Sequence, residues 1–408
     1  MSDFKYELEV LSPLHVGSGD LITPLEYVVV DDKFYRVDMS AVFRDEEFNV
    51  EAFMEAVGRD ERLRFSDFSS PELGKRYERY ALALSAVTGK DLESRAGDVR
   101  EFIKTKERPY VPGSSIKGAI RTAMLWNALK EDPGKLRALK NHLRRLMRQD
   151  KVDKKRVGEY IEKLVFGKEP HCEVLRALRV SDTEAASIER LEVYEVRTLT
   201  TIPSGHRWKG FYTFVEALKP GSRLTLRLKL DDFLMRREVA SVLEIEDKLW
   251  MLEKIPEACN ELAKYTIEGE LRFFRRYARE LSDILRFYED LHSKVAALLS
   301  SGCDERSFLL HLAWGVGWHG MTVGSLLKDD AVFFLNLRRA FELGAIRLCG
   351  NCGGKIRGNY CRRCRKKLSP REVRKTYVPE YPKTRRIVFE DGKARYPLGW
   401  VELRVCEG

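Results

Sequence analysis

The sequence predicts an α+β fold in which antiparallel strands alternate with inserted helical segments. Short runs such as 6–10 and 224–230 alternate polar and apolar residues with the two-residue period of a strand. Long charged stretches with helical spacing and few Gly or Pro residues, notably 41–105 and 232–300, separate these strand sets. Mixed antiparallel strands with helices between them are typical of α+β domains.

The N-terminal half opens with three expected strands. The first, 6–10, ends in the loop 11–19, which carries His15, Gly17, Ser18 and Gly19. The apolar runs 26–30 and 34–38 flank the turn Asp31-Asp32-Lys33 and predict a hairpin.

Strand character returns in the C-terminal half. The Pro-Gly turn at 218–221 predicts a hairpin between the two strands that it separates. We expect strands at 174–180, 191–196, 211–215, 224–230, 386–389 and 400–405, and an apolar run at 307–314 followed by helix to about residue 343.

The net charge of +10 at pH 7 indicates an anionic partner, most often nucleic acid or anionic lipid. Residues 135–156 hold ten basic and two acidic side chains, and residues 355–386 hold thirteen basic and two acidic. The rest of the 408-residue chain is therefore acidic. We expect the first block to be either a solvated helix face or a binding surface.

Several protein classes are excluded by composition. A 44% apolar content excludes a disordered chain, and no window approaches the roughly 20 apolar residues of a membrane span. The N-terminus lacks the apolar centre of a signal peptide. Eight clustered cysteines are too few for a disulfide framework, so we expect a cytoplasmic protein with no membrane partner.

Four of the cysteines have the spacing of a metal site. Cys349 and Cys352 are followed after eight residues by Cys361 and Cys364, and two such pairs supply four thiolates for tetrahedral Zn²⁺. Two disulfides are the alternative, which a reducing compartment disfavours. Because protein fills all four positions, the predicted zinc ribbon at 345–368 is structural.

The segment around Gly113 is predicted to be a turn followed by a helix through 116–126. Its serines, Ser114 and Ser115, are candidate helix caps, and the order of Lys117 and Gly118 differs from that of a phosphate-binding Walker loop. Lys117 and Arg121 oppose the helix dipole, so the pattern indicates either a bound anion such as phosphate or a basic surface face.

A late segment matches the glycine pattern of dinucleotide-binding loops. Gly315, Gly317 and Gly320 follow an expected strand, but bulky Trp318 and His319 crowd the place of a pyrophosphate, so we reject a dinucleotide site. The loop suits a phosphate backbone, with Trp314 or Trp318 as a stacking face or as core residues.

These segments together resemble the RAMP superfamily of CRISPR-associated proteins. Within it the chain is most similar to the subunit-five family of type III-A (Csm) effector complexes. The resembling residues are 11–19, 110–123, 178–182, 215–221, 314–324 and 396–400.

The resemblance implies two ferredoxin-like (RRM-like) modules with helical insertions and a non-catalytic, RNA-binding role. The modules would span 1–180, with insertions at about 41–105 and 130–165, and 181–408, with an insertion at about 232–300 and the zinc ribbon. The subunit would cap one end of the complex on the 3′ part of the CRISPR RNA and serve assembly, RNA maturation and antiviral defence.

Carried over by position, three glycine loops would contact the RNA. Expected partners are the CRISPR RNA and other Csm subunits, especially the backbone RAMP subunit; target RNA and a host nuclease stay open. The expected RNA-binding residues are His15, Gly17, Ser18, Gly19, Gly113, Ser114, Ser115, Lys117, Arg121, Gly315, Gly317 and Trp318.

An endoribonuclease that processes CRISPR RNA or cleaves target RNA is the alternative. His15 or His206 would act as general acid or base with Tyr27, and Lys117 would stabilise the transition state. Asp38 would instead support metal-dependent cleavage. A third hypothesis assigns the ribbon and its flanking basic residues to binding a protein or RNA, because cations there offset the charge of the zinc–thiolate site.

Overall fold

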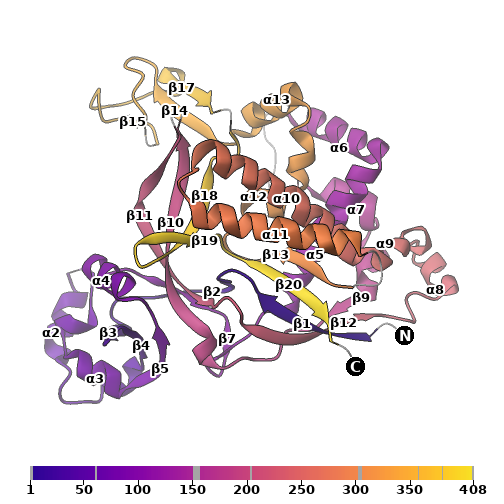
Figure 1. The fold of residues 1–408 in the computed structure, drawn as a ribbon. Helices are drawn as coiled ribbons and strands as arrows, with labels where there is room; N and C mark the ends of the chain where they lie inside the picture. The colour runs from indigo at the N-terminus through magenta and orange to yellow at the C-terminus, as the bar shows by residue number, and fades with distance from the viewer. Residues whose placement is uncertain are drawn as a thin grey trace.

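The computed structural model describes residues 3–59, 62–149, 157–202, 205–301, 306–356, 358–378 and 380–406. Two β-sheets form the framework of this part of the chain, and the longest helices pack against the first of them (Figure 1). The α+β fold class is therefore confirmed.

The first sheet has five antiparallel strands in the order β13-β20-β1-β12-β9. At its centre, β1 alternates exposed and buried side chains, as its sequence predicts, and pairs with β12 on one side and β20 on the other. The strands are β1 (Asp3–Val10), β9 (Leu178–Val180), β12 (Arg223–Leu230), β13 (Phe308–His311) and β20 (Trp400–Val405).

Helices α5 (Gly113–Glu131) and α10 (Ile255–Tyr277) complete a ferredoxin-like unit on this sheet. The chain order β1, α5, β9, β12, α10, β20 is the βαββαβ order of that fold, and four of the strands lie in the order β20-β1-β12-β9. Strands from both sides of residue 180 share the sheet. The predicted division into 1–180 and 181–408 thus does not separate two independent sheets, because β1 pairs with strands from the second range.

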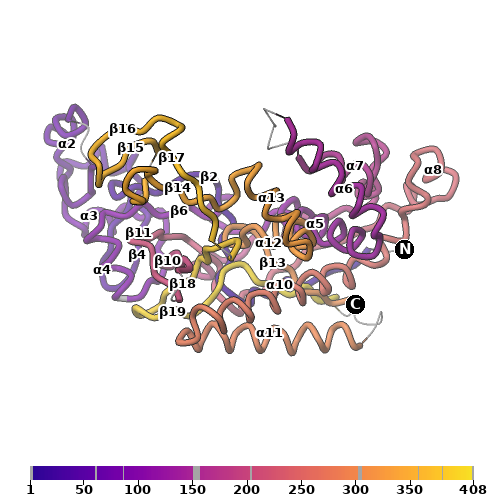
Figure 2. Tube along the Cα trace, turned by 90° about the horizontal axis from the view of Figure 1, so that it is seen from above, coloured from indigo at the N-terminus to yellow at the C-terminus, as the bar shows by residue number. Residues whose placement is uncertain are grey.

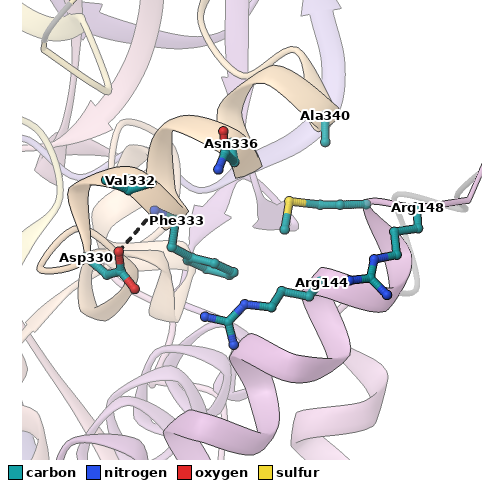
Figure 3. A pocket seen from close by; sticks show the side chains of 8 residues that line it. Arg144, Arg148, Asp330, Val332, Phe333, Asn336 and Ala340 are labelled. Atoms are coloured by element: carbon teal, nitrogen blue, oxygen red, sulfur yellow. Dashed lines mark hydrogen bonds between the residues drawn. The ribbon is translucent and has the colours of Figure 1, made fainter.

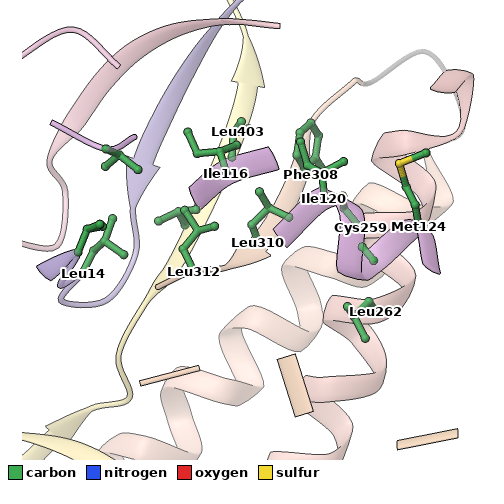
Figure 4. Packing of buried hydrophobic residues seen from close by; sticks show 14 of the residues in the cluster. Leu14, Ile116, Ile120, Met124, Cys259, Leu262, Phe308, Leu310, Leu312 and Leu403 are labelled. Carbon is green, nitrogen blue, oxygen red and sulfur yellow. The ribbon is translucent and has the colours of Figure 1, made fainter. Parts of the chain in front are cut away.

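The main core lies between this sheet and the two helices. Ile116 and Ile120 of α5 are fully buried against Leu310 and Leu403 of the sheet, and Leu262 of α10 packs in the same cluster (Figure 4). Each such side chain contributes about 1.5–3 kcal/mol through burial. Helix α11 (Ser282–Ser300) packs on α10.

The second sheet has nine strands and includes the expected hairpin of β3 and β4. Its order is β2-β6-β11-β10-β5-β4-β3, with β18 paired to β10 and β19 to β18. The strands are β2 (Gly17–Ile22), β3 (Tyr27–Val30), β4 (Lys33–Val37), β5 (Glu78–Ala83), β6 (Val99–Phe102), β10 (Leu191–Ile202), β11 (Gly205–Leu218), β18 (Thr384–Glu390) and β19 (Lys393–Tyr396).

The predicted hairpin across 218–221 is wrong. β11 pairs with β10 and β6, whereas β12 pairs with β1 and β9, so the turn carries the chain from one sheet to the other. Alternation of polar and apolar residues indicates a strand but does not determine which strand it pairs with. The strand expected at 174–180 is also shorter, because 174–177 is a 3₁₀ helix.

The segment 41–105 is not purely helical. Its helices surround β3, β4 and β5 in a lobe at one side of the molecule (Figure 1), but the segment also contributes β5 and β6 to the second sheet. The lobe's helices are α1 (Met39–Val42), α2 (Val50–Val57), α3 (Pro71–Arg76) and α4 (Ala86–Arg95).

The other helices lie mostly at the opposite end of the molecule (Figure 2). The insertion 130–165 contains α6 and α7, with 150–156 outside the described residues, and 232–300 contains α8 to α11. Further bounds are α6 (Pro133–Leu146), α7 (Glu159–Phe166), α8 (Arg237–Val242), α9 (Trp250–Glu253), α12 (Gly317–Met321) and α13 (Ala331–Phe341). The 3₁₀ helices are η1 (Phe65–Asp67), η2 (Pro170–Cys172), η3 (Val174–Ala177), η4 (Ile188–Arg190), η5 (Glu246–Lys248), η7 (Val323–Leu327) and η8 (Pro370–Glu372).

The cysteine segment forms a small separate unit beyond one end of the β10–β11 hairpin (Figure 1). Its strands are β14 (Ala345–Cys349) paired with β17 (Val373–Tyr377), and β15 (Tyr360–Cys361) paired with β16 (Lys366–Lys367); a further short pair is β7 (Lys104–Thr105) with β8 (Arg108–Pro109). Across the described ranges, no helix combines the length and apolarity needed to cross a bilayer.

Candidate functional site

The loop after β1 is fixed by a buried histidine. His15 Nδ1 donates to the Glu216 carbonyl oxygen at 2.7 Å, which leaves Nε2 as an acceptor. Burial lowers the pKa of His15 to about 4, so the ring is neutral at pH 7. A Cβ atom on Gly17 would lie 3.1 Å from Nε2, so a larger residue would crowd the ring. His15 therefore has a positioning role.

Beneath this loop lies a buried polar network centred on Glu216. Its carboxylate accepts from the Tyr80 hydroxyl at 2.7 Å, the Phe102 backbone at 2.8 Å and Lys104 Nζ at 2.5 Å. The network ties β11 to β5, β6 and β7. It supports the start of β2, where residues 17–20 are exposed.

The late glycine loop lies directly beside the His15 loop. Trp314 N donates to the His15 carbonyl oxygen at 3.2 Å, and the two ring centroids are 5.7 Å apart. Gly315 has φ +111°, and a Cβ atom there would lie 2.6 Å from Leu398 Cβ. Gly399 N donates to the Pro13 carbonyl oxygen at 2.9 Å. The structure thus joins three segments that are far apart in sequence.

Two exposed arginines meet on Trp314, and sequence reasoning did not single them out. The Arg100 and Arg386 guanidinium carbons lie 5.4 Å and 4.3 Å from the indole centroid. In the described ranges neither arginine has a carboxylate within ion-pair distance. Partial desolvation of its guanidinium against the protein, and then repulsion by Arg100, lowers the pKa of Arg386. Two like charges held together in this way favour a bound anion.

The sequence gives little indication that Arg100, Trp314 and Arg386 come together. Arg386 is the last residue of the basic block 355–386, and Arg100 is one charged residue in a short strand. Their meeting depends on β6, β18 and the late loop being brought together by long-range sheet pairing.

The start of α5 is packed against the segment after β9. Gly113 N donates to Asp182 Oδ1 at 2.7 Å, and a Cβ atom on Gly113 would lie 2.4 Å from the Val180 carbonyl oxygen. Only glycine fits this close approach. The predicted serine cap is wrong, because the helix begins at Gly113 with Pro112 at the N-cap, so Ser114 and Ser115 are already inside the first turn.

The cations on this helix have partners within the protein. Lys117 Nζ donates to the Leu178 carbonyl oxygen at 2.7 Å, and burial lowers its pKa. Arg121 forms ion pairs with Glu162, at 2.8 Å, and Glu173. These contacts offset the unfavourable position of the two cations near the helix N-terminus.

Trp318 lies against protein rather than presenting a free face. Its ring centroid is 5.0 Å from that of Tyr381 and 5.9 Å from that of Phe334. A Cβ atom on Gly324 would lie 2.1 Å from the indole, so glycine makes room for it. Gly317, with φ +71°, stays exposed at the helix start.

The residues of the endoribonuclease alternative are engaged in structural hydrogen bonds. Asp38 caps α1 by accepting from Ser40 N and Ala41 N at 3.0 and 3.3 Å. His206 Nδ1 lies 3.1 Å from the Tyr277 carbonyl oxygen, and the Tyr27 hydroxyl donates to the Gly97 carbonyl oxygen at 2.8 Å. Burial raises the pKa of Tyr27.

The four predicted ligand cysteines come together. Their sulfurs all lie within 4.8 Å of one another, with Cys349–Cys364 at 3.8 Å and Cys352–Cys361 at 3.6 Å. These separations exceed the roughly 2.05 Å of a disulfide. They match the edge of about 3.8 Å of a tetrahedron with zinc–sulfur bonds of about 2.3 Å. Backbone N–H groups, first that of Cys352, lower the pKa of Cys349 to about 7.

The model of the RAMP superfamily matches residues 7–317, more than half of the chain. The chain belongs to the RAMP superfamily. This confirms the superfamily resemblance and, together with the sheet order, the ferredoxin-like character of the fold.

Similar proteins carry one name. "CRISPR system Cms protein Csm5" of Methanocaldococcus jannaschii is 22% identical over 98% of this chain and 88% of its own length. The protein of that name from Streptococcus thermophilus is 31% identical over 30% of this chain and 40% of its own length.

Solved structures share the fold of this RAMP protein. A chain of a Csm–crRNA–target RNA ternary complex in a type III-A CRISPR-Cas system is 24% identical, with a TM-score of 0.67 over 99% of this chain and 100% of that one. The crystal structure of T. onnurineus Csm5 is 23% identical, with a TM-score of 0.61 over 97% of this chain and 99% of that one.

Proposed function

We propose that this protein is the subunit-five component of a type III-A CRISPR (Csm) ribonucleoprotein. It caps one end of the complex in the cytoplasm, binds the 3′ part of the CRISPR RNA and contacts the backbone RAMP subunit, which supports RNA maturation and antiviral defence. The names of the similar proteins support this assignment. Target RNA is a further proposed partner, because a chain of a Csm–crRNA–target RNA complex shares this fold.

The cluster of Arg100, Trp314 and Arg386 is the observation that carries the RNA-binding role. Each guanidinium supplies planar donors for phosphate oxygens, and the indole holds both in place. The adjacent exposed strand start, Gly17 to Asp20, lets a phosphate backbone approach without steric hindrance. Such contacts position RNA and leave its sequence to base pairing elsewhere.

Photo-crosslinking tests the path of the RNA. In the assembled complex, CRISPR RNA with 4-thiouridine in its 3′ part is expected to crosslink to peptides that contain Trp314 or Arg100. RNA with the label in its 5′ part serves as the matched control. A crosslink from the 5′ label alone, or from neither label, contradicts the proposal.

We propose that the subunit does not itself cleave RNA. The neutral, buried His15 and the capping Asp38 support this, because each is held by structural contacts. Repeat RNA incubated with the purified protein is expected to stay intact with and without EDTA. Cleavage that is lost in a His15→Ala variant would overturn the assignment.

We further propose that Cys349, Cys352, Cys361 and Cys364 hold a structural Zn²⁺ ion. Four thiolates leave no open position, so the metal would hold the ribbon together and supply no catalytic group. Purified protein is expected to contain about one zinc per chain by elemental analysis. A Cys361→Ser variant should lose it, whereas Cys172→Ser, a half-buried thiol outside the cluster, should retain it. Zinc-free protein with two disulfides contradicts the proposal.

A further inference from the structure

A groove lies between the end of α6 and α13 (Figure 3). Its volume is about 530 Å³, and its walls come from the end of α6 and from α13 (Figure 3). Arg144 and Arg148 project into it from the first wall, and Val332, Asn336 and Ala340 lie on the second.

The lining residues of the two walls share a spacing of four residues. Arg144 and Arg148 are four residues apart, and so are Val332, Asn336 and Ala340, so the groove extends for about 12 Å along α13. The first wall is cationic, whereas the second presents Val332, Asn336 and Ala340, with the carboxylate of Asp330 at its start. An occupant must therefore present negative charge along one side and apolar or small groups along the other.

Asp330 is close enough for Arg144 to lower its pKa, but no carboxylate forms an ion pair with Arg144 or Arg148 in the described part of the chain. The carboxylate of Asp330 accepts from Phe333 N at 3.0 Å and pairs with Lys140 at 3.6 Å. Arg144 hydrogen-bonds only the neutral Asn141 side chain, and Arg148 has no ion-pair partner among the described residues. Both guanidinium groups are thus available to an anionic ligand.

The apolar side of the groove favours a protein over RNA. Val332 is 74% exposed and Ala340 is exposed as well, which leaves apolar side chains of this wall in contact with water. Phe333 is buried, with the Arg144 guanidinium 5.2 Å from its ring centroid, so it offers no open face for a nucleobase. RNA would meet the arginines but leave Val332 uncovered.

We propose that the α6–α13 groove docks an acidic amphipathic helix of a neighbouring protein subunit. Carboxylates four residues apart on that helix would pair with Arg144 and Arg148, since side chains at this spacing share one face. Its apolar side chains would cover Val332 and Ala340. That the partner belongs to the same ribonucleoprotein rests on the proposed function above.

A site-specific photocrosslinker tests the docking in the assembled ribonucleoprotein. With p-benzoylphenylalanine in place of Val332, the crosslink is expected in another subunit, at a segment with two acidic residues in one helical turn. Arg144→Glu with Arg148→Glu should reduce this crosslink at least tenfold. The same probe at Met54, which is 64% exposed on α2, should be unaffected by the charge reversal.

The outcomes separate this inference from the RNA-binding role. A crosslink to RNA or to a second copy of this chain, an absent crosslink, or one that survives the charge reversal overturns the docking proposal. RNA affinity of the purified Val332→Asp variant should stay within twofold of the wild-type value. If the wild-type protein binds no RNA, the proposed function fails instead, whatever the crosslink shows.

Discussion

The start of α5 and the pair of loops around Trp314 were both expected to contact RNA, yet only the first pairs its cations with acceptors of the protein itself. Lys117 and Arg121 are engaged by a carbonyl oxygen and two carboxylates of the protein itself. Arg100 and Arg386 instead share one indole without a carboxylate in the described ranges. A cation that lacks an internal partner is the better indicator of an anionic ligand than a cation in a suggestive motif.

The two regions are also stabilised by different kinds of contact. The α5 start is held by tight backbone packing, in which Gly113 meets the segment after β9. The loop pair is held from below by buried polar groups, Glu216 and His15. Breaking these buried groups therefore gives the largest expected effects.

We expect Glu216→Ala to lower the free energy of unfolding by about 3–5 kcal/mol, because the Tyr80 hydroxyl and the Phe102 N–H lose their buried acceptor and Lys104 keeps only Glu101, at 3.3 Å. Urea denaturation measures the change. Glu246→Ala, which removes an exposed ion pair with Arg237, serves as the control and should cost less than about 1 kcal/mol. Equal costs would show that the network does not support the loop.

His15→Asn should reduce the acid sensitivity of the protein. Below pH 6.5 the unfolded chain protonates this histidine while the folded protein, with a pKa of about 4, does not. The free energy of unfolding therefore falls as the pH drops from 6.5 to 4, by about 3 kcal/mol for this group.

The His15→Asn variant keeps a hydrogen-bond donor for the Glu216 carbonyl oxygen. Between pH 6.5 and 4 its free energy of unfolding, measured by urea titration at several pH values, should fall by about 3 kcal/mol less than that of the wild type. The matched change at His171, whose side chain is exposed, serves as the control. His311, also with a pKa of about 4, maintains a residual pH dependence. An unaltered profile in His15→Asn contradicts the assigned burial.

The two tryptophans should separate RNA binding from folding. Trp314→Ala frees both arginines and is expected to weaken RNA binding about tenfold. Binding must then immobilise two arginine side chains, and each costs roughly 0.7 kcal/mol of binding free energy. Trp318→Ala should instead lower the melting temperature while affinity stays within about twofold, since Trp318 packs on Tyr381 and Phe334. The reverse pattern would place the RNA at Trp318.

Local sequence pattern predicted much of the framework. Residues 6–10 and the strand at 400–405 show two-residue alternation, and the apolar runs of the β3–β4 hairpin flank a turn. The cysteine spacing alone predicted the sulfur cluster. In these places residues that are close together in the sequence determine the local structure.

Pairing between distant segments could not be predicted in this way. The turn at 218–221 has the composition of a hairpin turn, but β11 and β12 find their partners in different sheets. Likewise Arg100 and Arg386 are 286 positions apart in the sequence, and only the folded arrangement places them on Trp314. The internal partners of Lys117 and Arg121 were hidden for the same reason.

The salt dependence of RNA binding compares the two regions most directly. Each lost phosphate contact lowers the slope of log affinity against log salt by about 0.7 for single-stranded RNA. We predict that Arg100→Ala with Arg386→Ala lowers the slope by about 1.4, and Lys117→Ala with Arg121→Ala by less than half of that. An unchanged slope in the first variant, with a large fall in the second, would contradict the account.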